Sequence, residues 1–172
     1  MASEHKNLSE YQPDQIPDGK LFKVGIVVAK WNSQITDQLL QGCKATLTEH
    51  GVPQEQIFVE YVPGSYELPL GASLVDQKHN PDAVICLGCV IKGSTSHNEY
   101  INQSVASSLM QLGLVRRKPF IFGVLTPNNQ EQAEERAGGA HGNKGVEAAV
   151  TALEMIGLSK KLKESEKTIG FK

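Results

Sequence analysis

The sequence predicts an α/β fold, a three-layer sandwich in which a four-stranded parallel sheet carries helices on both faces. Four short apolar runs alternate with segments whose apolar residues recur at helical spacing. That alternation is typical of parallel strands joined by crossover helices. The runs are apolar almost throughout, as expected for strands buried on both faces.

Each element has its own signal in the chain. The first helix begins after Trp31 and ends before Gly51 and Pro53, both of which disfavour helix. The second helix is expected to use Leu70, Leu74 and Val75. The predicted strands span residues 21–29, 57–62, 82–91 and 120–125. The predicted helices span residues 35–47, about 70–75, 97–112, 129–137 and 146–156.

The chain is expected to hold one domain and two flanking segments. Residues 1–20 lack periodicity and contain Pro13, Pro17 and Gly19, which predicts a mobile or surface-hugging arm. Residues 21–172 form the α/β domain. Its last part, 160–172, is expected to be a charged tail.

Composition restricts the possible partners. The 172 residues carry a net charge of −2, which gives no general attraction to nucleic acid or to anionic membrane. The longest apolar runs are too short to span a bilayer. The polar segment 1–19 has no apolar signal core, so the expected location is the cytoplasm.

The cysteines and histidines do not form a metal pattern. Cys86 and Cys89 resemble a C-x-x-C pair, but an offset of three places strand side chains on opposite faces. Both are therefore expected to be small core residues. The five histidines show no metal-ligand spacing, so no metal site is predicted.

The segment Gly88–Tyr100 joins the end of the third strand to the start of a helix. Ligands of parallel sheets bind at the carboxyl ends of strands, and helix N-termini bind anions. Ser94 and Thr95 would let a phosphate approach the backbone, with His97 within reach. The alternative is a tight turn with an N-cap, with His97 as a surface residue.

Other distinctive side chains also follow predicted strands. The architecture brings them to one edge of the sheet. They supply an aromatic plate, a carboxylate and two cations, which suits a planar polar heterocycle with a phosphate. They are Trp31, Asn32, Ser65, Glu67, Phe122, Thr126, Arg136 and Lys144.

Each of these residues also has a purely structural interpretation. Trp31 or Phe122 could belong to the core. Glu67 could only complement a helix dipole. Arg136 could form a surface ion pair with the glutamates of 131–135, and Lys144 could simply be solvated.

Six segments occur in an order and spacing typical of one enzyme family, and on them the chain resembles the lumazine synthases of riboflavin biosynthesis. The resemblance covers residues 21–157 and leaves the first 20 residues outside. The segments are Trp31-Asn32, Pro63-Gly64-Ser65-Tyr66-Glu67, Gly88-x-Val90-Ile91-x-Gly93-x-Thr95-x-His97, Phe122-Gly123-Val124-Leu125-Thr126, Glu131-Gln132-Ala133-x-x-Arg136 and Gly142-Asn143-Lys144-Gly145.

The resemblance implies a transferase, 6,7-dimethyl-8-ribityllumazine synthase. Such an enzyme condenses 5-amino-6-(D-ribitylamino)uracil with 3,4-dihydroxy-2-butanone 4-phosphate and releases phosphate. It implies no metal and no organic cofactor. The expected sheet has a flavodoxin-like strand order.

The resemblance also implies roles for individual residues. His97 is the expected catalytic residue, which transfers protons. Trp31 would stack on the pyrimidine, and Glu67 would bind ribityl hydroxyls. The remaining expected substrate-binding residues are Asn32, Ser65 and Tyr66, Val90, Ile91 and Lys92, Ser94 and Thr95 on the phosphate with Arg136, and Phe122 and Lys144.

In this family Phe122, Arg136 and Lys144 would reach the site from a neighbouring subunit. The resemblance therefore implies a homopentamer, which many members pack into an icosahedral capsid. The short loop 138–145 favours the capsid. Riboflavin synthase is a further implied partner.

Two other functions fit parts of the pattern. A flavodoxin-like flavin carrier has a similar topology, but it would need a phosphate loop after the first strand, and residues 29–33 do not provide one. An aldolase that forms a Schiff base could use Lys92 or Lys144.

Overall fold

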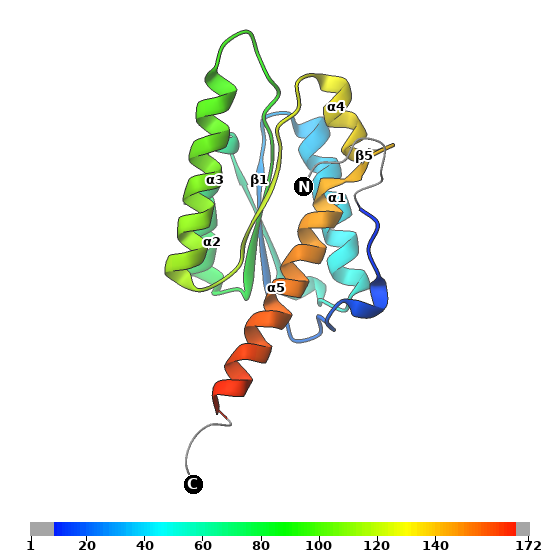
Figure 1. The fold of residues 1–172 in the computed structure, drawn as a ribbon, viewed down its shortest axis with the longest axis vertical. Coiled ribbons are helices and arrows are strands. Elements are labelled where there is room, and N and C mark those ends of the chain that lie inside the picture. Colours follow the sequence, from blue (N-terminus) through cyan, green and yellow to red (C-terminus); the bar gives the residue numbers. More distant parts are fainter. Residues whose placement is uncertain (1–8, 168–172) are drawn as a thin grey trace.

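The computed structural model describes residues 9–167, with side chains placed as far as residue 163. Four parallel strands form one sheet in the order β2-β1-β3-β4, which confirms the predicted class and strand arrangement (Figure 1). The strands are β1 (Val24–Ala29), β2 (Ile57–Val62), β3 (Ala83–Cys89) and β4 (Phe120–Leu125).

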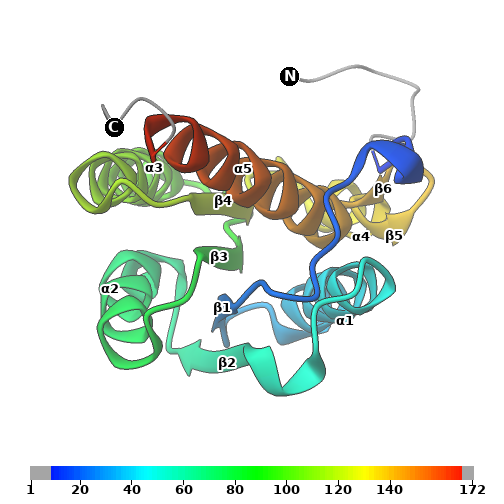
Figure 2. The ribbon, with the colours of Figure 1, turned by 90° about the horizontal axis from the view of Figure 1, so that it is seen from below.

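Helices cover both faces of this sheet. Figure 2 shows α2 (Leu68–His79) and α3 (His97–Arg116) on one side. The helices α1 (Ser33–Glu49) and α5 (Lys144–Lys167) lie on the other side. A short helix α4 (Gln130–Glu135) and a two-stranded ribbon, β5 (Ala137–Gly139) with β6 (Gly142–Asn143), precede α5.

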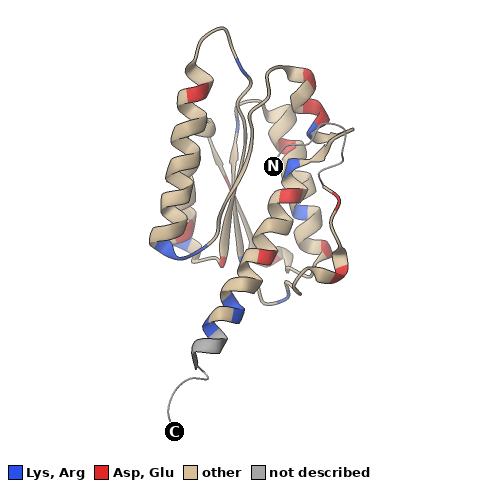
Figure 3. Ribbon diagram, viewed as in Figure 1, with Lys and Arg blue, Asp and Glu red and all other residues tan. Residues whose placement is uncertain are grey.

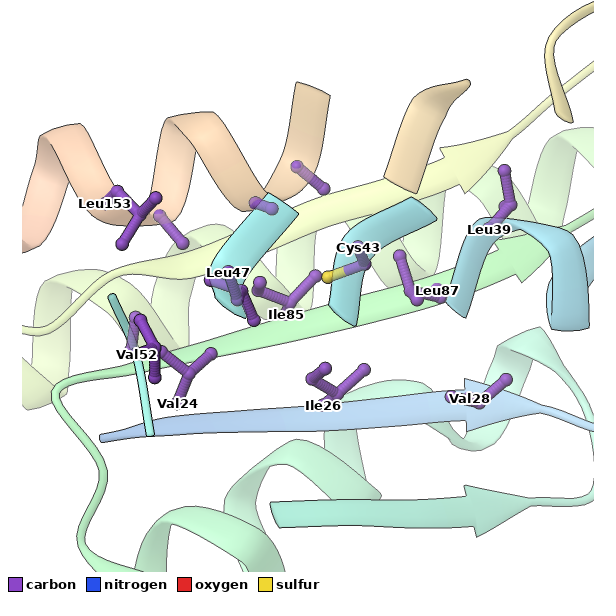
Figure 4. Close-up of a cluster of buried hydrophobic side chains, with 14 of the residues drawn as sticks. Val24, Ile26, Val28, Leu39, Cys43, Leu47, Val52, Ile85, Leu87 and Leu153 are labelled. Carbon is purple, nitrogen blue, oxygen red and sulfur yellow. The ribbon is translucent and has the colours of Figure 1, made fainter. Parts of the chain in front are cut away.

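The two central strands are buried along their whole length. Every residue of β1 and β3 is buried, whereas the edge strands β2 and β4 are only partly covered. Figure 4 shows strand residues such as Ile26 and Ile85 packed against Leu39, Leu47 and Leu153 of α1 and α5. Each such aliphatic side chain contributes about 1.5–3 kcal/mol when it is fully buried.

All three cysteines are buried and free, and Cys86 and Cys89 pack on opposite faces of the sheet as expected. Burial raises the pKa of the Cys89 thiol to about 11. It raises the pKa of Cys43 and Cys86 further above their usual range. The thiols are therefore protonated near neutral pH, which suits core packing and not thiolate chemistry.

The helices differ from the predictions in their buried faces. In α2, Leu68, Ala72 and Val75 point to the sheet, while Leu70 and Leu74 are exposed. Of the three apolar residues that marked this helix in the sequence, Val75 faces the sheet and the two leucines do not, because apolar spacing alone does not decide which face of the helix is buried. In α3 the buried residues are Val105 and Leu109.

The segments on either side of the domain lie close to it where they are described. Residues 9–20 run against α1 and α5: Tyr11 hydrogen-bonds His50 at 3.1 Å, and Pro17 packs on Gly157. Helix α5 continues to Lys167, across part of the segment expected to be a tail. Residues 1–8 and 168–172 of the arm and tail lie outside the described residues. None of the helices in residues 9–167 has the length and apolar character needed to cross a bilayer.

The start of α5 is held very close to α1. A Cβ atom at Gly145 would lie 1.9 Å from the carbonyl oxygen of Leu39, so no larger residue fits without moving a helix. We therefore expect Gly145→Ala to lower the free energy of unfolding by about 1–3 kcal/mol. Denaturant unfolding of both proteins measures the difference.

A matched control is Gly93→Ala, because nothing lies within 4 Å of a Cβ at Gly93. This change is expected to alter stability by less than about 0.5 kcal/mol. Equal losses in the two variants would contradict the proposed close contact.

Candidate active site

One cavity lies at the carboxyl edge of the sheet. The strands end in register there, with Ala29 beside Val62 and Cys89 beside Leu125. The loops that follow β1, β2 and β3 therefore meet and enclose about 650 Å³. Ten of the predicted site residues line this cavity: Trp31, Asn32, Ser65, Tyr66, Glu67, Val90, Ile91, Ser94, Thr95 and His97.

The turn after β1 presents Trp31 to the cavity. The backbone N–H of Trp31 donates to the carbonyl of Pro63 at 3.2 Å, and the ring remains 73% exposed. Asn32 has a left-handed backbone, with φ of 60°, and its amide Nδ2 donates to the carbonyl of Cys89 at 2.9 Å. Asparagine tolerates this conformation better than most residues. Asn32 thus ties the end of β1 to the end of β3 and leaves Trp31 as an uncovered aromatic plate.

The turn after β2 supplies a carboxylate and a hydroxyl. The backbone N–H of Gly64 donates to Oε2 of Glu67 at 3.0 Å, which fixes the carboxylate at the cavity wall. Ser65 is 6% exposed, and its Oγ has no hydrogen-bond partner among the described residues. An unpaired buried hydroxyl is costly. Ser65 is therefore a polar group available to a ligand once the cavity is occupied.

The loop after β3 leads into α3 and is exposed. Backbone N–H groups of Val90 and Lys92 donate to the carbonyls of Leu125 and Pro127 at 2.8 and 2.9 Å, which extends the β3–β4 pairing. Ser96 precedes α3, and its side chain does not cap the helix. His97 and Asn98, in the first turn of this 20-residue helix, line the cavity together with Ser94 and Thr95. This is the geometry of an anion site.

Four predicted site residues do not line the cavity: Lys92, Phe122, Arg136 and Lys144. Lys92 is exposed on the loop after β3. Phe122 is half-buried and lines a separate apolar groove between α3 and α5. Within one chain, the structure therefore does not bring these four residues to the cavity.

Arg136 and Lys144 share a carboxylate that the sequence analysis missed. Glu147 accepts from Arg136 Nη2 at 2.6 Å and from Lys144 Nζ at 3.0 Å. Arg136 Nη1 also donates to the carbonyl of His141 at 2.6 Å. The alternative of an ion pair with the glutamates of α4 is thus replaced by a pair with α5. The i,i+3 spacing of Lys144 and Glu147 was the available signal.

Six further residues line the cavity. Pro63, Gly64 and Gly93 belong to segments that the sequence analysis singled out, whereas Cys89, Asn98 and Ile101 were not predicted as site residues. Asn98 follows His97 directly, and its side-chain oxygen is buried without a partner among the described residues. Adjacency to His97 was the signal for it. The described part of the chain has no group of His, Cys, Asp or Glu side chains arranged to hold a metal ion.

The cavity thus combines an aromatic plate, a fixed carboxylate, an imidazole and a helix N-terminus. These groups can hold a flat polar ring and an anion side by side and can exchange protons with them.

Comparison with known proteins agrees with this chemistry. Residues 21–160 match the family described as 6,7-dimethyl-8-ribityllumazine synthase. The protein of that name from Porphyromonas gingivalis is 49% identical over 160 residues, which cover 93% of this chain and 99% of the relative. The one from Parabacteroides distasonis is 48% identical over 159 residues, which cover 92% of this chain and 99% of the relative. The one from Cytophaga hutchinsonii is 50% identical over 156 residues, covering 91% and 98%. The chain therefore belongs to the 6,7-dimethyl-8-ribityllumazine synthase family.

Proposed function

We propose that this enzyme condenses 5-amino-6-(D-ribitylamino)uracil with 3,4-dihydroxy-2-butanone 4-phosphate to form 6,7-dimethyl-8-ribityllumazine in riboflavin biosynthesis. The observation that carries the proposal is the cavity in which Trp31, Glu67 and His97 meet beside the N-terminus of α3. Mixing the two substrates with the protein should release phosphate and produce the fluorescent lumazine. Failure of the lumazine to form faster than in protein-free buffer would refute the proposal.

The reaction requires proton transfers more than a strong nucleophile. The pyrimidine amine attacks the ketone and water leaves as an imine forms. Loss of a proton and of phosphate then leaves an enol at the neighbouring hydroxyl-bearing carbon, which tautomerises to a second carbonyl. Attack of the ribityl-bearing nitrogen on that carbonyl closes the ring with loss of another water. Each step moves a proton, which an imidazole at His97 can give or accept. Holding both substrates in one cavity supplies much of the remaining acceleration.

The remaining assignments follow the position of each residue in the cavity. Trp31 stacks on the pyrimidine, and Val90 and Ile91 frame the same ring. Ser65 and Glu67 bind the amine side and the ribityl hydroxyls. Asn32 and Tyr66 complete the substrate contacts, and Ser94 and Thr95 hold the phosphate together with the N-terminus of α3. Lys92 does not line the cavity, and its expected substrate contact is kept from the family resemblance alone.

Phe122, Arg136 and Lys144 are assigned to the site of a neighbouring copy in a homopentamer. Two observations support this assignment. These residues do not line the cavity of their own chain. An apolar groove of about 650 Å³ that includes Phe122 lies beside exposed residues such as Leu114 and Met110, a large uncovered patch for a single chain. Packing of pentamers into an icosahedral capsid, riboflavin synthase as a partner and a cytoplasmic location belong to the same proposal.

Replacement of His97 tests the proton-transfer role. His97→Ala is expected to lower kcat by on the order of 10²–10⁴ while leaving both KM values nearly unchanged, because the imidazole moves protons and does not anchor a substrate. His79→Ala is the control, since His79 stacks on Phe58 at the other end of the sheet. Steady-state kinetics that show the same kcat for both variants would contradict the assignment.

Replacement of Arg136 tests the phosphate contact. Arg136→Ala is expected to raise KM for the butanone phosphate by about 10- to 100-fold, the loss typical of a charge-assisted hydrogen bond, with little change for the pyrimidine. Arg136→Lys should recover little, because an ammonium lacks the two-pronged geometry of a guanidinium. An equal rise for both substrates would exclude a selective phosphate role.

Mixed oligomers test the shared site. If His97 and Arg136 meet across an interface, two impaired variants, His97→Ala and Arg136→Ala, should regain activity after unfolding and assembly together, when assayed at a butanone phosphate concentration well below the KM of the Arg136→Ala protein. A random mixture should restore about a quarter of the sites, since each intact site needs one chain of each kind. Variants refolded separately and then mixed are the control. A monomeric mass, or no recovery in the co-assembled sample, would contradict the shared site.

A further inference from the structure

A second polar cavity lies at the opposite end of the sheet. It encloses about 220 Å³ between the segment that precedes β3, the end of α3 and the later part of α5. Figure 3 shows Lys and Arg residues at this end of α3 and on the lower part of α5. Five basic side chains line the cavity, against one carboxylate, that of Asp82: they are Arg116, Arg117, Lys118, Lys160 and Lys163.

Two of these basic side chains share one carboxylate. Asp76 is 2% exposed and pairs with both Arg116 and Lys118. Its carboxylate accepts from Arg116 Nε at 2.6 Å and from Lys118 Nζ. Lys118 also donates to Asn80 at 3.0 Å. These contacts hold the side chains of Arg116 and Lys118 in place. The other three cations are therefore the ones available to a ligand.

The other three cations have only long contacts, or none, with other described side chains and carbonyl groups. Lys160 Nζ lies 4.0 Å from Asp82, donates to the carbonyl of Leu21 at 3.3 Å and sits 4.4 Å from the centroid of the Phe22 ring. The side chains of Arg117 and Lys163 form no hydrogen bond or ion pair with another described residue. The cavity thus holds more positive charge than its own carboxylates neutralise.

The helix dipoles do not account for the whole cluster. The C-terminal end of α3 favours cations such as Arg116 and Arg117, but the effect is confined to the last turn. Lys160 lies about two turns before the end of α5. Arg117 also has a left-handed backbone, with φ of 49°, at a position where glycine is usual. An arginine at this position adopts an unfavourable backbone conformation, and its guanidinium lines the cavity.

We propose that this cavity is a second anion site, which binds a small phosphate-class ligand carrying two or more negative charges. Arg117 supplies a two-pronged donor, and Lys160 and Lys163 supply point charges from the facing helix. The small volume of about 220 Å³ and the small number of free cations favour a small ligand over a nucleic acid. The net charge of −2 also opposes binding of a long polyanion.

Calorimetric titration of pyrophosphate into the Arg136→Ala protein tests this site with anion binding at the proposed active site weakened. Pyrophosphate should bind, and adding either Arg117→Gly or Lys163→Gln should weaken binding by about tenfold or more, whereas any binding at the active site would not respond to these changes. Lys161→Gln, with the same change of charge at an exposed position that does not line the cavity, should have no such effect. Thermal unfolding is the control for folding, and Arg117→Gly should not lower Tm because glycine suits φ of 49°.

Three results would overturn the proposal. The first is the absence of pyrophosphate binding to the Arg136→Ala protein. The second is an equal loss in the Lys161→Gln control, which would indicate only general charge attraction. The third is tighter binding of a DNA oligonucleotide than of pyrophosphate, with affinity that increases with length, which would assign the patch to nucleic acid.

Discussion

The parallel register of the four strands is the constraint on which the rest of the structure depends. Because all strands run the same way and β1 and β3 pair in step with both edge strands, their carboxyl ends stop along one line. Every loop that leaves those ends must start beside its neighbours. The cavity is therefore a consequence of strand direction, and a one-residue slip in any strand would turn its buried side chains to the other face.

Local chemistry explains why much of the fold and the cavity could be predicted from the sequence. An apolar run such as β3 is readily identified as a buried strand of a parallel sheet. The polar residues in the loop after it, including Thr95 and His97, must then lie at the carboxyl edge of that sheet. Other features depend on contacts distant in sequence. Which stripe of α2 faces the sheet was decided by packing, and the unpaired Ser65 hydroxyl is visible only once its surroundings are known.

The charges near α5 show the same limit. The structural alternative for Arg136 named the glutamates of 131–135 as partners and was wrong, because the pair forms with Glu147. Four nearby glutamates are possible partners, and the turn at 137–143 decides between them. That turn places Glu147 against both Arg136 and Lys144. One carboxylate between two cations leaves a positive excess and holds the guanidinium in a single orientation. This arrangement suits the proposed role of Arg136 in phosphate binding, because its side chain would lose little conformational freedom when a phosphate binds.

The exposed apolar surface of this chain and the absence of some predicted residues from its cavity are linked. Trp31 is an aromatic plate with one open face, and α3 buries only Val105 and Leu109 along 20 residues. Both features are unfavourable for an isolated chain, because each Å² of apolar surface that stays in water lacks about 25 cal/mol of hydrophobic stabilisation. A neighbouring copy that covered α3 would remove the cost and could carry its own Phe122 toward the cavity. The proposed pentamer therefore offers one physical reason both for the uncovered helix and for the position of Arg136, the proposed phosphate ligand, outside the cavity of its own chain.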